Sequence, residues 1–212
     1  MKMKLIVTAI AASIAAMAQS TVDTPFQVRY MSNLNNGDSV MNITNSGARG
    51  AGLAAGTSAS TTGAICANVY AFSPDEQMIS CCSCPVTPNG LVSLSAKNDL
   101  ISNTLTPAVP TSIVVKVLGT APAGGSCANS AAQVETLTQA SGLISWATTV
   151  HAGAVAGTFA QTETAFAPAT LSVGPGSELV RLGQLCTFIQ ANGSGFGICR
   201  SCRLGGLGAG RL

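Results

Sequence analysis

Short runs in which apolar and polar residues alternate recur along most of this chain. Ile65, Ala67 and Val69 occupy every second position, which is the two-residue period of a β-strand. Turn-forming residues at 73–75 then let residues 76–82 return as the second strand of a hairpin. The same pattern predicts further strands at residues 26–31, 39–45, 91–96, 112–118, 143–152 and 159–166.

One segment near the C-terminus has a helical period instead. Leucines and Cys186 recur there at spacings of three and four residues, with Ser177 before them as an N-cap. Asn192-Gly193 would end this helix, which we expect over residues 177–191. Many short strands and one late helix predict a mainly β fold: a disulfide-stapled β-sandwich or open barrel with one C-terminal helix.

The first 18 residues have the features of a secretory signal peptide. Lys2 and Lys4 give a positive start, an apolar stretch follows, and Ala16-Met17-Ala18 fits the small-x-small cleavage pattern. The apolar stretch is shorter than the roughly 20 residues that a membrane-spanning helix needs. We therefore expect residues 1–18 to be removed and the remaining chain, without a membrane span, to be secreted or to lie on the cell surface or in the periplasm.

The remaining chain divides by composition. Residues 19–63 are rich in Ser, Thr, Asn, Gly and Ala, and we expect a low-complexity segment with short strands that could extend the sheet of a neighbouring molecule. Residues 64–212 contain the larger apolar runs. We expect the core to begin at Ala64 and to form one β-rich domain with the helix and a cysteine-containing tail.

Eight cysteines follow the predicted signal peptide, an even number that favours disulfide bonds in an exported protein. If the first hairpin turns at Pro74, Cys66 lies opposite Cys82, close enough for a bridge. Cys81 then faces away and needs Cys186 or the tail cysteines as its partner. A bridge from the 81–84 cluster to the tail would be worth roughly 4–5 kcal/mol. The disulfide candidates are Cys66, Cys81, Cys82, Cys84, Cys127, Cys186, Cys199 and Cys202.

A metal site is the rival interpretation of these cysteines. Residues 81–84 and 199–202 together could offer four thiolates to zinc. The CxC spacing of the first cluster differs from the usual zinc knuckle, and thiols outside the cytosol oxidise readily. We therefore expect disulfides, with no bound metal and no other cofactor.

Charged residues make up only 8% of the chain, against roughly 25% in an ordinary globular protein. Without Lys2 and Lys4, eight basic residues balance eight acidic ones. Such a chain cannot form the broad positive surface that nucleic-acid binding needs. A neutral, thinly charged surface tends to associate, which indicates packing against copies of itself or against envelope or matrix components.

The sequence offers little for catalysis. His151 is the only histidine, and the chain contains no G-x-S-x-G element. Asp75 and Glu76 are adjacent at a predicted turn, so they do not form the separated pair of carboxylates that glycoside hydrolysis needs. We therefore expect no enzymatic activity.

Two segments carry a resemblance to other proteins. The runs Cys-Ala-Asn-Val-Tyr-Ala-Phe, from Cys66, and Cys-Cys-Ser-Cys-Pro-Val-Thr-Pro-Asn-Gly-Leu, from Cys81, resemble uncharacterised exported bacterial proteins that contain cysteines. The ending from Gln190 to Cys202 is similar to theirs as well. The resemblance implies export and carries over no functional site.

The leading hypothesis is a secreted or cell-surface structural protein that associates with itself or forms filaments. The alternative is an extracellular module that binds carbohydrate or another neutral ligand, with Tyr30, Tyr70, Trp146 and Phe196 as candidate aromatic residues. Trp146 shares a predicted strand face with other apolar residues, so we expect it in the core. A thiolate metal-binding protein is the second alternative.

Overall fold

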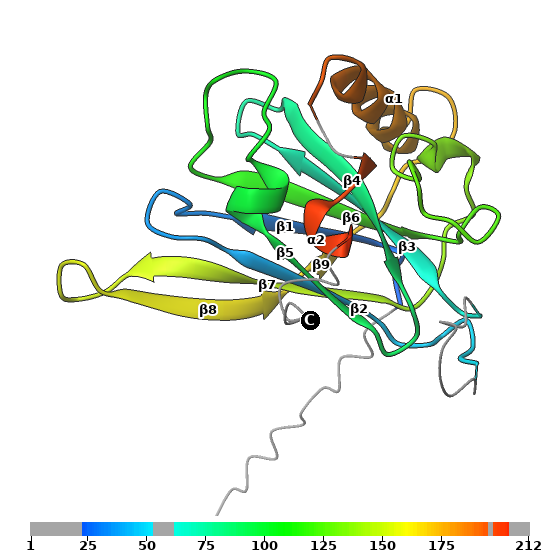
Figure 1. The fold of residues 1–212 in the computed structure, drawn as a ribbon, viewed down its shortest axis with the longest axis horizontal. Helices are drawn as coiled ribbons and strands as arrows, with labels where there is room; N and C mark the ends of the chain where they lie inside the picture. The colour runs from blue at the N-terminus through cyan, green and yellow to red at the C-terminus, as the bar shows by residue number, and fades with distance from the viewer. Residues whose placement is uncertain (1–22, 53–61, 195–196, 204–212) are drawn as a thin grey trace, which may run out of the picture.

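Two β-sheets packed face to face form the framework of the described chain (Figure 1). The computed structural model describes residues 23–52, 62–194 and 197–203, so the predicted signal peptide, residues 1–18, lies outside the described residues. The prediction of a mainly β fold with one long helix near the C-terminus is confirmed. Of the two architectures expected, the facing sheets have that of a sandwich.

The two sheets, A and B, have six and four strands. Sheet A is ordered β10 (Gly197–Ile198), β4 (Met78–Val86), β3 (Ile65–Phe72), β6 (Ile113–Thr120), β1 (Phe26–Met31) and β9 (Ala167–Pro168). Sheet B is ordered β5 (Leu91–Ser95), β2 (Val40–Asn45), β7 (Leu143–Ala152) and β8 (Phe159–Ala165). Neighbouring strands are antiparallel except β10, which runs parallel to β4.

The predicted strands lie close to their expected places. The ranges 26–31 and 143–152 match β1 and β7 in full, and β7 forms the expected hairpin with β8. β4 differs, because it continues through Pro85 to Val86, beyond the end expected at residue 82. Proline is tolerated there because β10 pairs with Cys82 and Ser83 alone, which leaves Pro85 at a sheet edge.

The register of the β3–β4 hairpin also differs from the expected one. Ser73 N–H donates to the Gln77 carbonyl at 2.9 Å across a turn that is longer than predicted. Cys82 therefore lies opposite Val69, and Cys66 lies opposite Pro85. The partner of Cys66 is displaced by three residues, an odd number, so Cys66 and Cys82 lie on opposite faces of sheet A.

The core between the sheets begins earlier than expected. Met31 of β1 and Met41 and Ile43 of β2 are fully buried in the same cluster as Val69 of β3. β2 is paired on both sides, and β1 pairs with β6 on one side and with β9 on the other. The expected start of the core at Ala64 is therefore wrong, and neither strand presents a fully open edge to a neighbouring molecule.

Helix α1 (Glu178–Ala191) covers the outer face of sheet A. Ser177 Oγ accepts a hydrogen bond from Val180 N–H at 3.4 Å, which confirms the predicted N-cap. Leu182 and Ile189 are buried in a second apolar cluster that includes Tyr70 of β3. The short helical segments of the described chain are η1 (Ala96–Leu100), η2 (Val134–Thr136) and α2 (Arg200–Arg203).

Candidate functional site

All eight predicted disulfide cysteines are paired. The predicted link between the 81–84 cluster and the tail is confirmed, and Cys186 is the partner of Cys81. A bridge between Cys66 and Cys82 is wrong, because the register places these two side chains on opposite faces of sheet A. The observed pairs are Cys66–Cys127, Cys81–Cys186, Cys82–Cys199 and Cys84–Cys202.

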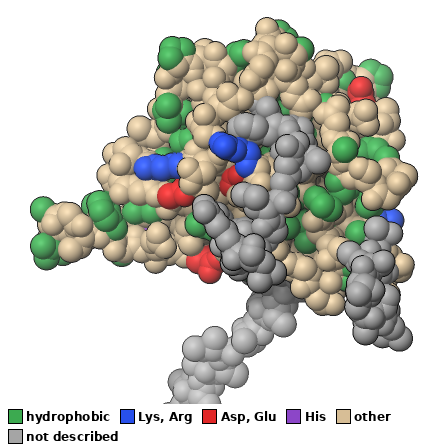
Figure 2. Space-filling model, in the orientation of Figure 1, with side chains coloured by type: hydrophobic (Ala, Val, Ile, Leu, Met, Phe, Trp, Pro, Cys, Tyr) green, Lys and Arg blue, Asp and Glu red, His purple; other side chains and the backbone are tan. Residues whose placement is uncertain are grey.

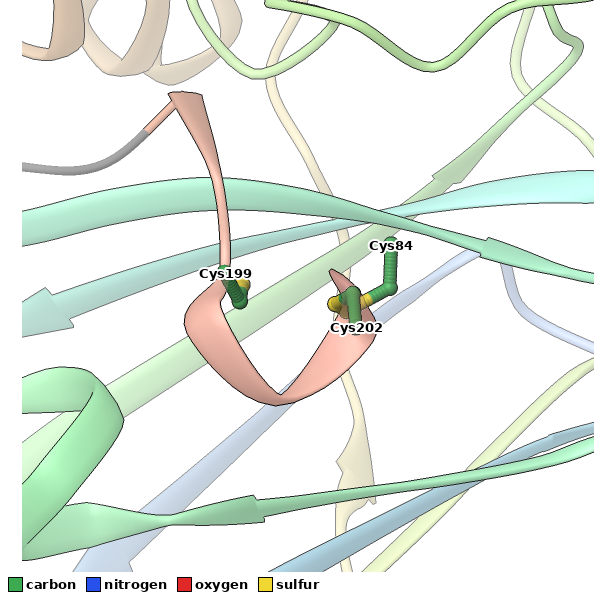
Figure 3. Close-up of side chains that lie close together, drawn as sticks. All are labelled: Cys84, Cys199 and Cys202. Atoms are coloured by element: carbon green, nitrogen blue, oxygen red, sulfur yellow. A yellow bond between two sulfur atoms is a disulfide. The ribbon is translucent and has the colours of Figure 1, made fainter. Parts of the chain in front are cut away.

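The tail cysteines, Cys199 and Cys202, lie beside α2, which packs against β4 of sheet A and β5 of sheet B (Figures 1 and 3). We call this edge of the sandwich its mouth. Cys82 and Cys84 belong to the inner core and bond the tail at Cys199 and Cys202. The sulfur atoms of Cys84, Cys199 and Cys202 lie within 4.8 Å of one another. A zinc site needs thiolates, and disulfide sulfurs are not thiolates. Metal binding here would require both bonds to be reduced first.

A buried carboxylate holds the same tail segment. Asp99 of η1 is 1% exposed. Its oxygens accept hydrogen bonds from Ser201 N–H at 3.0 Å, from Ser201 Oγ at 2.6 Å and from Ser95 N–H at 2.8 Å. Three donors compensate the burial of one charge. Asp99 therefore fastens α2 to the end of β5 and acts as a structural residue of the mouth.

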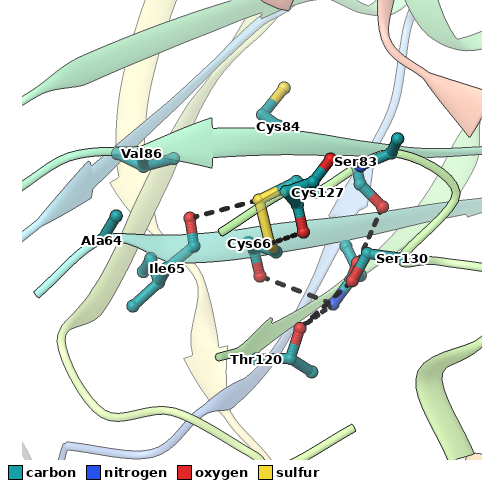
Figure 4. The surroundings of a disulfide bond; sticks show 12 residues. Ala64, Ile65, Cys66, Ser83, Cys84, Val86, Thr120, Cys127 and Ser130 are labelled. Atoms are coloured by element: carbon teal, nitrogen blue, oxygen red, sulfur yellow. Dashed lines mark hydrogen bonds between the residues drawn. A yellow bond between two sulfur atoms is a disulfide. The ribbon is translucent and has the colours of Figure 1, made fainter. Parts of the chain in front are cut away.

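The Cys66–Cys127 disulfide ties the 121–142 loop to the outer face of sheet A beside a buried polar network (Figure 4). Asn68 Nδ2 donates to Thr120 Oγ1 at 2.9 Å, and Ser83 Oγ donates to Asn68 Oδ1 at 2.7 Å. Ala131 N–H in turn donates to Ser83 Oγ at 2.7 Å. Because these buried groups satisfy one another, the network is a structural connection between the loop and the sheet.

His151 lies exposed near the end of β7. Its Nε2 is 2.8 Å from Thr162 Oγ1 on the neighbouring strand β8. Among the described residues, no carboxylate forms a hydrogen bond with the ring, so the acid that orients a catalytic histidine is not part of this arrangement. Asp75 is engaged elsewhere, because it accepts a hydrogen bond from Ser73 Oγ in the β3–β4 turn.

Strand β8 is an open edge of sheet B. All seven of its residues are exposed, and it pairs with β7 alone. Phe166, directly after it, donates its N–H to the Ser145 carbonyl at 2.9 Å in the register of the β7–β8 pair. Inward and outward N–H groups alternate along an antiparallel strand. The N–H groups of Phe159, Gln161 and Glu163 therefore point away from β7.

β8 has few of the features that protect edge strands. It contains no Lys and no Pro, its register with β7 is continuous, without a bulge, and Glu163 is its one charged residue. The other sheet edges are short or covered: β9 and β10 have two residues each, and α2 contacts β5. Within the described chain, β8 is thus the long edge that can accept a further strand.

Beyond Ala147, where its pairing with β2 ends, the β7–β8 hairpin projects from the sandwich as an arm, residues 148–163 (Figure 1). Arg29 of β1 fixes the arm at its base, where Nη2 donates to Thr149 Oγ1 at 3.0 Å and Nη1 donates to Thr164 Oγ1. Burial lowers the pKa of Arg29 from its ordinary value. Near the tip, Val155 and Phe159 are 66% and 55% exposed. The arm therefore has a fixed base and an uncovered apolar end.

Trp146 lies on the outer face of sheet B, so its expected position in the core is wrong. The neighbouring Leu143 and Ser145 point inward and are buried, whereas Ile144 is 47% exposed and Trp146 is half-buried. The inward face of β7 meets Gln27 of β1, whose amide bonds the β7 backbone. Ser145 lies opposite the fully buried Ile43 of β2, so these two side chains share the inner face, and Ile144 and Trp146 lie on the outer face.

The other candidate aromatic residues are not brought together. Tyr30 is 59% exposed on β1. Tyr70 is fully buried beneath α1, its hydroxyl donates to the Ala131 carbonyl at 2.9 Å, and burial raises its pKa well above the ordinary value. Phe196 lies outside the described residues. The described aromatic residues therefore do not form a shared platform for stacking sugar rings.

No protein-family model, curated protein or solved structure matches this chain. The resemblance to exported, cysteine-containing bacterial proteins stays a prediction. Among the described residues, no helix is long and apolar enough to span a membrane. The four disulfides are typical of proteins in an oxidising compartment.

Proposed function

We propose that this is a secreted or cell-surface structural protein whose copies associate by pairing their β8 strands. The observation that carries the proposal is the open edge of β8, seven exposed residues with no Lys, Pro or bulge. Pairing at such an edge satisfies main-chain donors and acceptors and is a recurrent mode of association between chains. The predicted signal peptide and the four disulfides support export.

A second copy of this chain is the partner that suits the edge. An antiparallel β8–β8 pair around a two-fold axis joins two four-stranded sheets into one. With the axis at Gln161, Phe159 of one copy lies opposite Glu163 of the other, so like charges are not directly opposed. Because the remaining edges are short or covered, this contact closes at a dimer instead of continuing into a filament.

The distribution of charge is compatible with this contact. Glu163 is the one charged residue of β8, and its carboxylate accepts a hydrogen bond from Asn42 Nδ2 at 2.9 Å. Figure 2 shows only a few charged side chains on the face it presents. A surface with little net charge produces little long-range repulsion between copies.

Sedimentation equilibrium of the purified protein tests the proposal. We expect a reversible monomer–dimer equilibrium for the wild type. Gln161→Pro removes an outward N–H and no N–H that bonds β7, so it should give a folded monomer with the circular dichroism spectrum of the wild type. Gln161→Ala is the matched control, because it keeps the N–H and should dimerise like the wild type.

Two results would overturn the association. One is a wild-type protein that stays monomeric at the highest soluble concentration. The other is a Gln161→Pro variant that is folded and still dimerises as strongly as Gln161→Ala, which would place the contact elsewhere on the surface.

A further inference from the structure

Two uncovered apolar features of sheet B lie near opposite ends of the arm. Phe159, near the tip, is 55% exposed, and its partner across the hairpin is the small residue Ala152. Where the arm leaves the sandwich, Ile144 is 47% exposed and Trp146 is half-buried, with the exposed Ala165 of β8 beside it. We call Ile144, Trp146 and Ala165 the base patch. Each copy of the chain therefore has one uncovered ring and one uncovered apolar patch.

Phe159 and the base patch belong to the same face of the sheet. Trp146 lies on the outer face, and Ala165 is its direct partner across the β7–β8 pair, so Ala165 points outward as well. Phe159 and Ala165 are six residues apart, an even number, in a strand without a bulge. The Phe159 side chain therefore also points outward. A two-fold axis perpendicular to the sheet keeps the outer faces of two paired copies on one side.

Antiparallel pairing of β8 brings the tip of one arm to the base of the other. With the axis at Gln161, Phe159 of one copy is opposite Glu163 of the second copy and diagonal to its Ala165. Aromatic side chains are long enough to reach a diagonal neighbour. With the axis one residue further on, at Thr162, Phe159 would lie directly opposite Ala165. Phe159 thus approaches the base patch with either axis.

The surface at this point leaves room for an incoming ring. The side chain of Ala165 is a single methyl group, so a ring that lies over it can contact Trp146 on the next strand. Glu163 is turned away from the open edge, because its carboxylate accepts a hydrogen bond from Asn42 Nδ2 of β2 at 2.9 Å, two strands inward. Phe159 can therefore pack against Trp146 without displacing a charged group, and aromatic pairs of this kind gain more than their buried area alone provides.

We infer that Phe159 of each copy packs on the base patch of the other copy, against Trp146, and that this contact selects a second copy of the chain as the partner of β8. The inference rests on the proposed pairing of β8 and names the side chains that make it specific. Main-chain pairing alone accepts many extended strands, whereas pockets for side chains give specificity. A strand without an aromatic residue at this position would leave the base patch uncovered. The two-fold axis forms the contact twice in each dimer.

Tryptophan fluorescence combined with sedimentation equilibrium tests the contact, because Trp146 is the one tryptophan of the chain. For the wild type we expect the emission maximum to move to shorter wavelength over the concentrations at which the dimer forms, since the indole loses contact with water. Phe159→Ala should weaken the dimer about a hundredfold, because two contacts worth about tenfold each are lost. Its circular dichroism spectrum should stay that of the wild type, because Phe159 is exposed in the single copy.

Val155→Ala is the matched control, because it removes an apolar side chain that is 66% exposed at the same tip but lies outside β8. This variant should dimerise like the wild type, with the same change in emission. A wild type that sedimentation finds monomeric would contradict the pairing of β8 itself. A wild-type dimer without a change in Trp146 emission, or a Phe159→Ala variant that dimerises as strongly as the wild type, would overturn the contact alone. Equal weakening by Val155→Ala and Phe159→Ala would overturn it as well, because association would then depend on general apolar exposure of the tip.

Discussion

Cys81 and Cys82 are adjacent in the chain, yet their disulfides lie on opposite sides of sheet A. Cys81 bonds Cys186 of α1 on the outer face, and Cys82 bonds Cys199 in the core between the sheets. Successive side chains of a strand point to opposite faces, so two neighbouring cysteines can hold two different layers. β4 thereby fastens a helix, a sheet and the C-terminal tail to one another.

Thiol titration under denaturing conditions should find no free thiol, and metal analysis should find no zinc. The physical reason is that all eight sulfurs are used in disulfides. Peptide mapping without reduction should link the 81–84 segment both to α1 and to the tail. Several free thiols together with bound zinc would instead support the metal-binding alternative.

Asp99→Asn should lower the free energy of unfolding by about 1–3 kcal/mol. The carboxylate of Asp99 accepts three hydrogen bonds through two oxygens, whereas an Asn amide has one acceptor oxygen. The NH₂ group of the amide would face groups that are themselves donors, so hydrogen bonds would be lost. Urea denaturation measures the change. The exposed turn residue Asp75 provides the control, since Asp75→Asn should change stability by no more than about 0.5 kcal/mol. Equal effects of the two substitutions would contradict the structural role of Asp99.

Ser177→Ala should destabilise the protein by about 1 kcal/mol, because Val180 N–H loses its acceptor at the start of α1. Ser177→Asp retains an acceptor at the same position and should keep most of the stability. Thermal unfolding of the two variants measures the difference. A Ser177→Asp variant that is as unstable as Ser177→Ala would show that the cap contributes little here.

The stability of the wild type should fall as the pH rises above about 10, the ordinary pKa of tyrosine. Burial raises the pKa of Tyr70 in the folded state, so between the two pKa values the unfolded chain loses a proton that the folded chain keeps. The favourable contribution is complete below the unfolded pKa and disappears as the pH approaches the folded one. Over this pH range the urea concentration at the midpoint of unfolding should fall less steeply with pH in Tyr70→Phe than in the wild type. Tyr30→Phe, which changes an exposed tyrosine, should keep the pH dependence of the wild type.

Strand positions and the helix start were predictable because the signals behind them are local. The alternation in residues 143–152 marks β7 whatever lies beside it, and the Ser177 cap acts on a residue only three positions away. The hairpin that β7 forms with β8 follows from the same local patterns. The disulfide candidates could also be named from an even number of cysteines in a chain with a predicted signal peptide.

The candidate site was harder to predict from the sequence. Whether β8 is a central strand or an edge depends on which strands lie beside it, and these come from distant parts of the chain. One available signal is its composition, since residues 160–164 contain no large apolar side chain that a buried strand would need.

Local pattern alone settles that this chain is mainly β, has one long late helix and carries little charge, because period, capping and composition do not depend on distant contacts. Register and burial depend on them. A longer turn after Ser73 displaces the partner of Cys66 by three residues and exchanges the faces of the expected pair. The pairing of Ser145 with the buried Ile43 of β2 likewise puts Ser145 inside and Trp146 outside. Those choices, and with them the open edge of β8, arise only when the strands and the two sheets pack together.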